Sequence, residues 1–116
     1  MREIPLILIG GGFSSIEIID LIEDINKIDK NFQLAFIDAD KENYSKYFDL
    51  LIDKIDINGI IIADNVLWSG KVINKEKDHE TQELDYYNKK VDNDSRVENI
   101  LLSVRDGLMV CRKISN

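Results

Sequence analysis

Three short apolar runs recur in the first 64 residues of the chain, and each one ends abruptly in glycine or in acidic side chains. They are PLILIG at 5–10, FQLAFID at 32–38 and GIIIAD at 59–64. Apolar runs of this length, bounded by turn and charged residues, predict buried strands. The longer segments between them have room for helices, and strands that alternate with helices predict an α/β fold with right-handed crossovers.

Helical periodicity fills both connections. Ser14 stands three residues before Glu17, which is the spacing of a capping box, and apolar residues continue at helical intervals to Ile28. One face of the second helix is predicted to carry the following apolar residues: Tyr44, Tyr47, Phe48, Leu51, Ile52 and Ile55. The strand at 59–64 is apolar on both faces, as expected in the middle of a parallel sheet that helices cover.

The last part of the chain has a different pattern. A third helix is indicated by Leu84, Tyr87 and Val91, with Asp78 as its N-terminal cap. The turn residues 105–107 (Arg-Asp-Gly) then separate two apolar runs, which is a strong hairpin signal. We therefore predict a single domain with a mostly parallel, Rossmann-like sheet that carries a C-terminal antiparallel hairpin at one edge.

Charge and composition narrow the function classes. The chain has 116 residues, with 22 acidic against 15 basic side chains, and this balance argues against a nucleic-acid surface. No apolar run is long enough for a membrane span, and the start MREIPLILIGGG lacks the features of a signal peptide, so we expect a cytoplasmic location. The single cysteine, Cys111, lies in an apolar run and is expected to be buried and inert.

Polar side chains end two successive strands. Asp38 and Asp40 close the strand at 32–38, and Asp64 and Asn65 close the strand at 59–64. Because the carboxyl ends of parallel strands form one crevice, we expect these groups to meet at an exposed rim of the sheet. Oxygen ligands without histidine or cysteine favour Mg²⁺ or Ca²⁺ over zinc.

The sequence also permits a purely structural interpretation of each of these residues. Asp40 fits the cap of the next helix, the Asp64–Asn65 pair fits a turn, and Lys41 fits a solvated residue at a helix start. Only the combination at two strand ends favours a site.

From about residue 34 to residue 114, the chain resembles the C-terminal half of the metal-dependent O-methyltransferases of the caffeoyl-CoA type, which are relatives of catechol O-methyltransferase. The resemblance is carried by three blocks of sequence: FIDADKENYSKYFDLL, NGIIIADNVLWSGKV and YYNKKVDNDSRVENILLSVRDGLMVCRK. It implies that Asp38, Asp64 and Asn65 bind a divalent cation and that Lys41 is the base that deprotonates the acceptor hydroxyl.

The resemblance also implies softer assignments. Asp40 and Tyr47 match positions near the methyl donor or the acceptor, and Trp68 matches an aromatic residue at the acceptor site. The implied function is methyl transfer from S-adenosylmethionine to a catechol-like or other phenolic hydroxyl, with Mg²⁺, or else Ca²⁺ or Mn²⁺, as the metal. The family resemblance further suggests a homodimer.

Residues 1–37 are similar instead to the first unit of the sugar O-acyltransferases related to sialic acid O-acetyltransferase. This similarity predicts that a glycine-turn unit at 1–37 has a different origin from the methyltransferase-like part at 38–116. Backbone N–H groups at Gly10 and Gly12 would offer a cradle for a cofactor phosphate or other anion. An alternative function is therefore a noncatalytic module that binds a nucleotide or a nucleotide-sugar.

Overall fold

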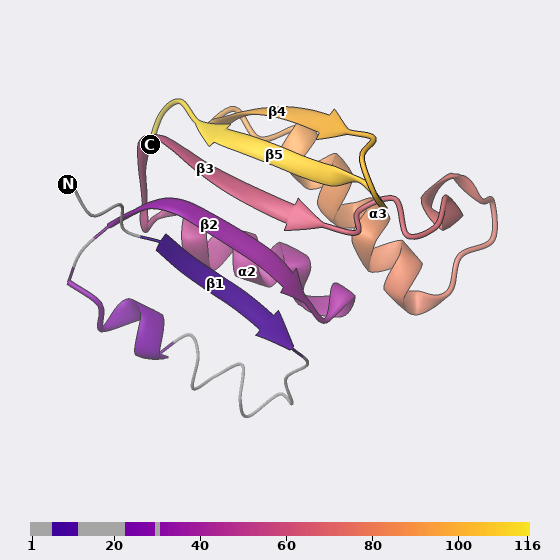
Figure 1. Ribbon diagram of the computed structural model, residues 1–116, viewed down its shortest axis with the longest axis horizontal. Coiled ribbons are helices and arrows are strands. Elements are labelled where there is room, and N and C mark those ends of the chain that lie inside the picture. Colours follow the sequence, from indigo (N-terminus) through magenta and orange to yellow (C-terminus); the bar gives the residue numbers. More distant parts are fainter. Residues whose placement is uncertain (1–5, 12–22, 30) are drawn as a thin grey trace.

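The structure, a computed structural model, describes residues 6–11, 23–29 and 31–116. Five strands form one mixed sheet in the order β1-β2-β3-β5-β4 (Figure 1). Strands β1, β2 and β3 are parallel, β5 runs antiparallel to β3, and β4 runs antiparallel to β5. The strands are β1 Leu6–Gly11, β2 Phe32–Ala39, β3 Ile55–Asp64, β4 Val97–Leu102 and β5 Leu108–Lys113. The predicted α/β class, parallel strands and C-terminal hairpin at one edge are confirmed.

Two helices cover one face of the sheet. Figure 1 shows α2 (Tyr44–Ile52) and α3 (His79–Asp92) behind the strands. Large side chains of these helices, among them Phe48 and Tyr87, are fully buried together with Ile37 and Ile61 from the sheet. The helix that we predicted from Ser14 to Ile28 lies mostly outside the described residues, although residues 23–26 are helical.

The opposite face of the sheet carries exposed apolar side chains. Leu8 on β1 is 68% exposed and Ile100 on β4 is 58% exposed. The register places Phe36, Ile62 and Val110 between them in one row across the sheet. Among the described residues, no helix packs on this row, so the helices of the described part of the chain cover only one face of β3.

The second helix ends earlier than its apolar pattern indicates. Ile55 continues the helical spacing of Leu51 and Ile52, but it is the first residue of β3. The buried ammonium group of Lys113 donates hydrogen bonds to the carbonyl oxygens of Ile52 and Ile55, at 2.8 and 3.0 Å. It thereby satisfies a carbonyl at the helix end that the helix itself leaves without a partner.

An irregularity in β3 accommodates its early start. The pairing register with β2 shifts between Phe32 and Leu34, and Asn58 has a left-handed backbone with φ 71°. A Cβ atom on Gly59 would lie 2.6 Å from Cγ2 of Ile55 and 2.8 Å from the carbonyl oxygen of Asp56. Only glycine therefore fits where the strand resumes its regular course.

The predicted cap of α3 is confirmed. The Asp78 carboxylate accepts hydrogen bonds from the backbone N–H and the hydroxyl of Thr81, at 2.9 and 2.6 Å. These bonds, first that from the hydroxyl and then that from the N–H, lower the pKa of Asp78. The predicted C-terminal hairpin is likewise confirmed. The Cys111 thiol is buried, as expected, and burial raises its pKa to about 12.

Replacing Asp78 with alanine is expected to lower the melting temperature by a few degrees, because the first turn of α3 loses its acceptor. The pKa of Asp78 is lower in the folded state, so its stabilising effect is present above the unfolded-state pKa and is lost as the pH falls through the folded-state pKa. Thermal unfolding at neutral and at acidic pH checks this. The difference between the two proteins should shrink in acid, and an Asp78→Asn control should retain most of the cap at both pH values.

One further property concerns membranes. Within the described ranges, none of the helices combines the length and the apolar character that a bilayer crossing requires.

Candidate functional site

The carboxyl ends of β2 and β3 bring the predicted metal ligands together. Ile37 pairs with Ala63, so Asp38 and Asp64 follow at the same level on neighbouring strands. The amide nitrogen of Asn65 lies 3.2 Å from Oδ1 of Asp38, and the backbone N–H of Asn65 donates to Oδ1 of Asp64 at 2.8 Å. Asn65 adopts a left-handed backbone with φ 62°, which asparagine tolerates better than most residues. The three residues therefore form one contiguous polar cluster.

Asp64 is buried, which corrects the expectation of an exposed rim at this position. Its side chain is only 1% exposed, whereas that of Asp38 is 51% exposed. The second carboxylate oxygen of Asp64, Oδ2, accepts no hydrogen bond. A guanidinium nitrogen of Arg105 lies 3.0 Å from this oxygen, within ion-pair distance, although the contact does not have hydrogen-bond geometry. A buried carboxylate oxygen that lacks a donor and faces a positive charge is suited to a cation.

The side chains of this cluster fit a hard divalent ion if the amide group of Asn65 is turned around. In the described part of the chain, no group of three histidine, cysteine or acidic side chains is arranged to hold a metal. The cluster supplies two carboxylates, so the third protein ligand would be the amide oxygen of Asn65. The Asn65 amide now presents its nitrogen to Asp38, and a rotation of the amide by about 180° would present the oxygen instead.

Lys41 lies inside the site rather than in solvent. It is 7% exposed, so its interpretation as a solvated residue at the helix start is wrong. Its ammonium group donates to the carbonyl oxygen of Ala39 at 3.0 Å and to the Tyr44 hydroxyl at 2.6 Å, and it lies 3.6 Å from Oδ1 of Asp38. The turn of 3₁₀ helix at Lys41–Asn43, directly after β2, directs this side chain back toward the strand ends.

Tyr44 is a site residue, although its helical spacing in the sequence predicts only a position in the core. Its hydroxyl accepts from Lys41 and donates to the backbone carbonyl of Asp64 at 2.7 Å. Burial, and secondarily the charge of Asp38, raises the pKa of Tyr44, so the phenol stays neutral. The spacing of three residues between Lys41 and Tyr44, at the start of a helix, was the available signal.

Asp40 and Tyr47 contact each other. The Tyr47 hydroxyl donates to one carboxylate oxygen of Asp40, and the side-chain amide of Asn43 donates to the other. Burial and this hydrogen bond raise the pKa of Tyr47. Asp40 makes no side-chain capping hydrogen bond to the helix that follows, so the interpretation of this residue as a cap is wrong.

The Trp68 ring also lies near Lys41. The Lys41 ammonium is 5.4 Å from the centre of the Trp68 ring, within range of a cation–π contact. Trp68 has a left-handed backbone, with φ 52°. The next residue, Ser69, is held by its N–H, which donates to the Asp106 carboxylate at 2.7 Å. The hairpin turn therefore fixes the loop that carries the aromatic ring.

The glycine turn is described only in part. Gly10 pairs with Asp38 across β1 and β2, and a Cβ atom on Gly10 would make an ordinary contact at 3.5 Å with the Asp38 carbonyl oxygen. Gly12 lies outside the described residues.

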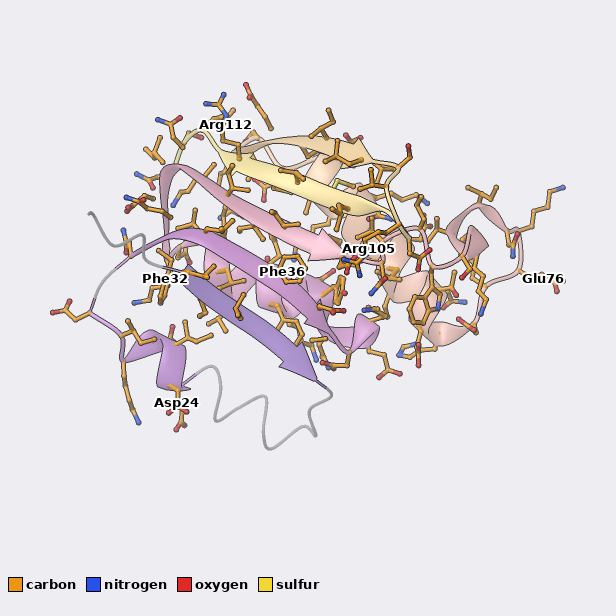
Figure 2. The ribbon with its side chains drawn as sticks, viewed as in Figure 1. Asp24, Phe32, Phe36, Glu76, Arg105 and Arg112 are labelled. Atoms are coloured by element: carbon orange, nitrogen blue, oxygen red, sulfur yellow. The ribbon has the colours of Figure 1, made fainter. Side chains whose placement is uncertain are left out.

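The polar cluster is at the same end of the sheet as Arg105, which Figure 2 shows at the carboxyl end of β3.

Solved structures share this arrangement of strands and helices. An O-methyltransferase from Bacillus cereus in complex with SAH is 29% identical, with a TM-score of 0.72 over 83% of this chain and 47% of that one. An SAH-bound methyltransferase from Podospora anserina is also 29% identical, with a TM-score of 0.69 over 79% of this chain and 45% of that one. The fold is therefore that of the S-adenosylmethionine-dependent methyltransferases.

Sequence comparison gives the family. A family model described as O-methyltransferase matches residues 11–114, so the chain belongs to the O-methyltransferase family. A caffeoyl-CoA O-methyltransferase from Mesembryanthemum crystallinum is 38% identical over 108 residues, which are 87% of this chain and 42% of that protein. Caffeoyl-CoA O-methyltransferase 1 from Nicotiana tabacum is 39% identical over 102 residues, 82% of this chain and 42% of that protein. The family resemblance stated above is confirmed.

The matches cover only part of the plant relatives, because the chain spans less than half of their length. The family match begins at residue 11 and thus includes most of the glycine-turn unit. The separate origin of residues 1–37 stays a prediction.

Proposed function

We propose that this chain carries the metal site and the acceptor site of a divalent-metal-dependent, S-adenosylmethionine-dependent O-methyltransferase. The observation that carries the proposal is the polar cluster in which Asn65 contacts both Asp38 and Asp64, with Lys41 at 3.6 Å from Asp38. Catechol-like phenols fit as acceptors, because two neighbouring oxygens can chelate one ion. The names of the plant relatives, caffeoyl-CoA O-methyltransferases, support this substrate class.

Three residues would hold the ion: Asp38 and Asp64 through carboxylate oxygens, and Asn65 through its amide oxygen. Bound there, a divalent ion supplies a Lewis acid that orients the acceptor and favours its phenolate form. The buried position of Asp64 makes its contribution strong, since charges interact more strongly away from water. Asp38, more exposed, borders the side open to solvent.

Lys41 would first release one proton of its ammonium group to solvent, and the neutral Nζ atom would then take the proton of the acceptor hydroxyl. The surroundings of Lys41 hold this atom in place, since the Ala39 carbonyl and the Tyr44 hydroxyl both accept from it. Tyr44 in turn is held by the carbonyl of Asp64, so one chain of hydrogen bonds connects the base to a metal ligand. Such a chain keeps the base and the ion in one fixed relation, as positioning for an in-line methyl transfer requires.

Trp68 and Asp40 would border the bound reactants. The Trp68 ring lies near the Lys41 ammonium, where it can stack against a planar phenolic acceptor. The Asp40 carboxylate, held by Tyr47 and Asn43, is suited to a positively charged sulfonium donor. Tyr47 would act on the methyl donor through its hydrogen bond to Asp40. Contacts of Gly10 and Gly12 with the methyl donor, S-adenosylmethionine, stay a prediction.

Isothermal titration of the chain with Mg²⁺, S-adenosylmethionine and a catechol tests the proposal. We expect Mg²⁺ to bind, and we expect catechol to bind only when Mg²⁺ is present, because chelation needs the ion. S-Adenosylmethionine should bind more tightly in the presence of Mg²⁺ and catechol, and transfer of its methyl group to catechol should stop when EDTA removes the metal.

The opposite pattern would contradict the proposal. Binding of a nucleotide-sugar without metal, together with no binding of Mg²⁺ or catechol, would favour the noncatalytic module instead. A homodimer, a cytoplasmic location and the absence of nucleic-acid binding stay predictions.

A further inference from the structure

The side chain of Arg105 lies against the carboxylate oxygen of Asp64 that accepts no hydrogen bond. Oδ1 of Asp64 already accepts the backbone N–H of Asn65 at 2.8 Å. Oδ2 accepts no hydrogen bond and lies 3.0 Å from a guanidinium nitrogen of Arg105. The guanidinium and a divalent ion would therefore compete for the same atom.

The backbone of Arg105 is fixed at this position by the hairpin turn. The carbonyl oxygens of Asp106 and Gly107 accept the N–H groups of Leu67 and Val66, at 3.0 and 3.2 Å. The turn also packs tightly, since a Cβ atom on Gly107 would lie 2.6 Å from Cγ of Leu67. The turn is thus attached to the loop that directly follows Asp64 and Asn65, and the placement of Arg105 is a consequence of the fold.

The Arg105 side chain itself remains accessible. It is 68% exposed, whereas its partner Asp64 is 1% exposed. The guanidinium can therefore move out to solvent once another cation replaces it at Asp64, whereas the buried carboxylate cannot follow it. A buried carboxylate without any positive partner is unfavourable, so Arg105 neutralises Asp64 for as long as no other cation is bound.

We propose that Arg105 is a resident counter-ion that must be displaced before a divalent ion can bind Asp64, and that it thereby lowers the affinity of this chain for metal. This inference rests on the metal site of the proposed function. When the ion binds, the guanidinium moves out to solvent, because two cations cannot share one carboxylate oxygen without strong repulsion. Arg105 is a residue that tunes the site and is not itself a metal ligand.

The test is a titration of the chain and its Arg105→Ala variant with Mn²⁺ and Mg²⁺. We expect the variant to bind either ion about tenfold more tightly, and we expect the metal-free variant to melt at a lower temperature than the original chain, with the difference abolished by saturating metal. Arg105→Lys should bind metal with an affinity close to that of the original chain. Arg112→Ala, a matched loss of one exposed arginine that pairs with Glu98 at the other end of the sheet, should leave metal affinity unchanged.

A second readout follows the guanidinium directly. In nitrogen-15 NMR, the side-chain N–H signal of Arg105 should change its chemical shift and its line width as metal is added. The signal of Arg112 should stay constant. Equal or weaker metal affinity in Arg105→Ala would overturn the role of Arg105. Absence of metal binding in the original chain and in Arg105→Ala alike would overturn both this role and the metal site on which it rests.

Discussion

The Asp64→Ala variant is expected to lose divalent-ion binding almost completely, with an affinity at least about 100-fold lower than that of the original chain. Loss of an outer-shell partner of a metal site typically costs about 10–100-fold, and loss of a direct ligand should exceed this range. Asp64 is also the most deeply buried of the three predicted ligands, so no water-exposed side chain can take its place. Calorimetric titration with Mn²⁺ measures the difference.

The variant must also remain folded for this result to be informative. Removal of Asp64 leaves behind the exposed side chain of Arg105, which water can solvate, so we expect only a small change in melting temperature. Asp56→Ala is the matched control, because it removes an acidic residue near the other end of the same strand, where Asp56 accepts from Asn31. Unchanged metal affinity in Asp64→Ala would remove Asp64 from the ligand set.

The Lys41→Met variant is expected to bind Mn²⁺ at least as tightly as the original chain and to transfer methyl groups about 10²–10⁴-fold more slowly, which is the range for loss of a general acid or base. Methionine keeps most of the length of lysine and fills the buried position, but it cannot accept a proton. Initial rates of methyl transfer from S-adenosylmethionine to catechol, measured at saturating metal, give the comparison.

Two further variants separate the loss of the base from general disturbance of the site. Lys46→Met removes an exposed lysine from α2, the helix that follows Lys41, and should retain the original rate. Tyr44→Phe removes one acceptor of the Lys41 ammonium and should reduce the rate less than Lys41→Met does, because the Ala39 carbonyl still holds the base. Equal rates for Lys41→Met and the original chain would exclude Lys41 as the base.

Local patterns predicted most of the elements in the described residues. Each apolar run that ended in charge or glycine became a strand, and the Asp-Gly turn produced the hairpin. Ile55 was assigned to the wrong element because its spacing continues the helical face, whereas the helix end depends on Lys113, 58 residues further along the chain. A contact at such sequence separation leaves no periodic signal.

The convergence of Asp38, Asp64 and Asn65 was predictable because neighbouring parallel strands end at the same edge of a sheet. The burial of Asp64 was not predictable in the same way. It depends on the hairpin turn that brings Arg105 over the end of β3, and in the sequence Arg105 is recognisable only as a turn residue. The apolar character of both faces of β3 likewise indicates burial but does not say what covers each face.

Anomalous diffraction from crystals soaked in Mn²⁺ tests the central claim most directly. We predict one manganese peak at the ends of β2 and β3, with carboxylate oxygens of Asp38 and Asp64 and the amide oxygen of Asn65 each within about 2.0–2.4 Å of it, and with the Arg105 guanidinium turned out to solvent. A peak elsewhere in the molecule, or an Asp64 carboxylate still paired with Arg105 at saturating Mn²⁺, would contradict the account.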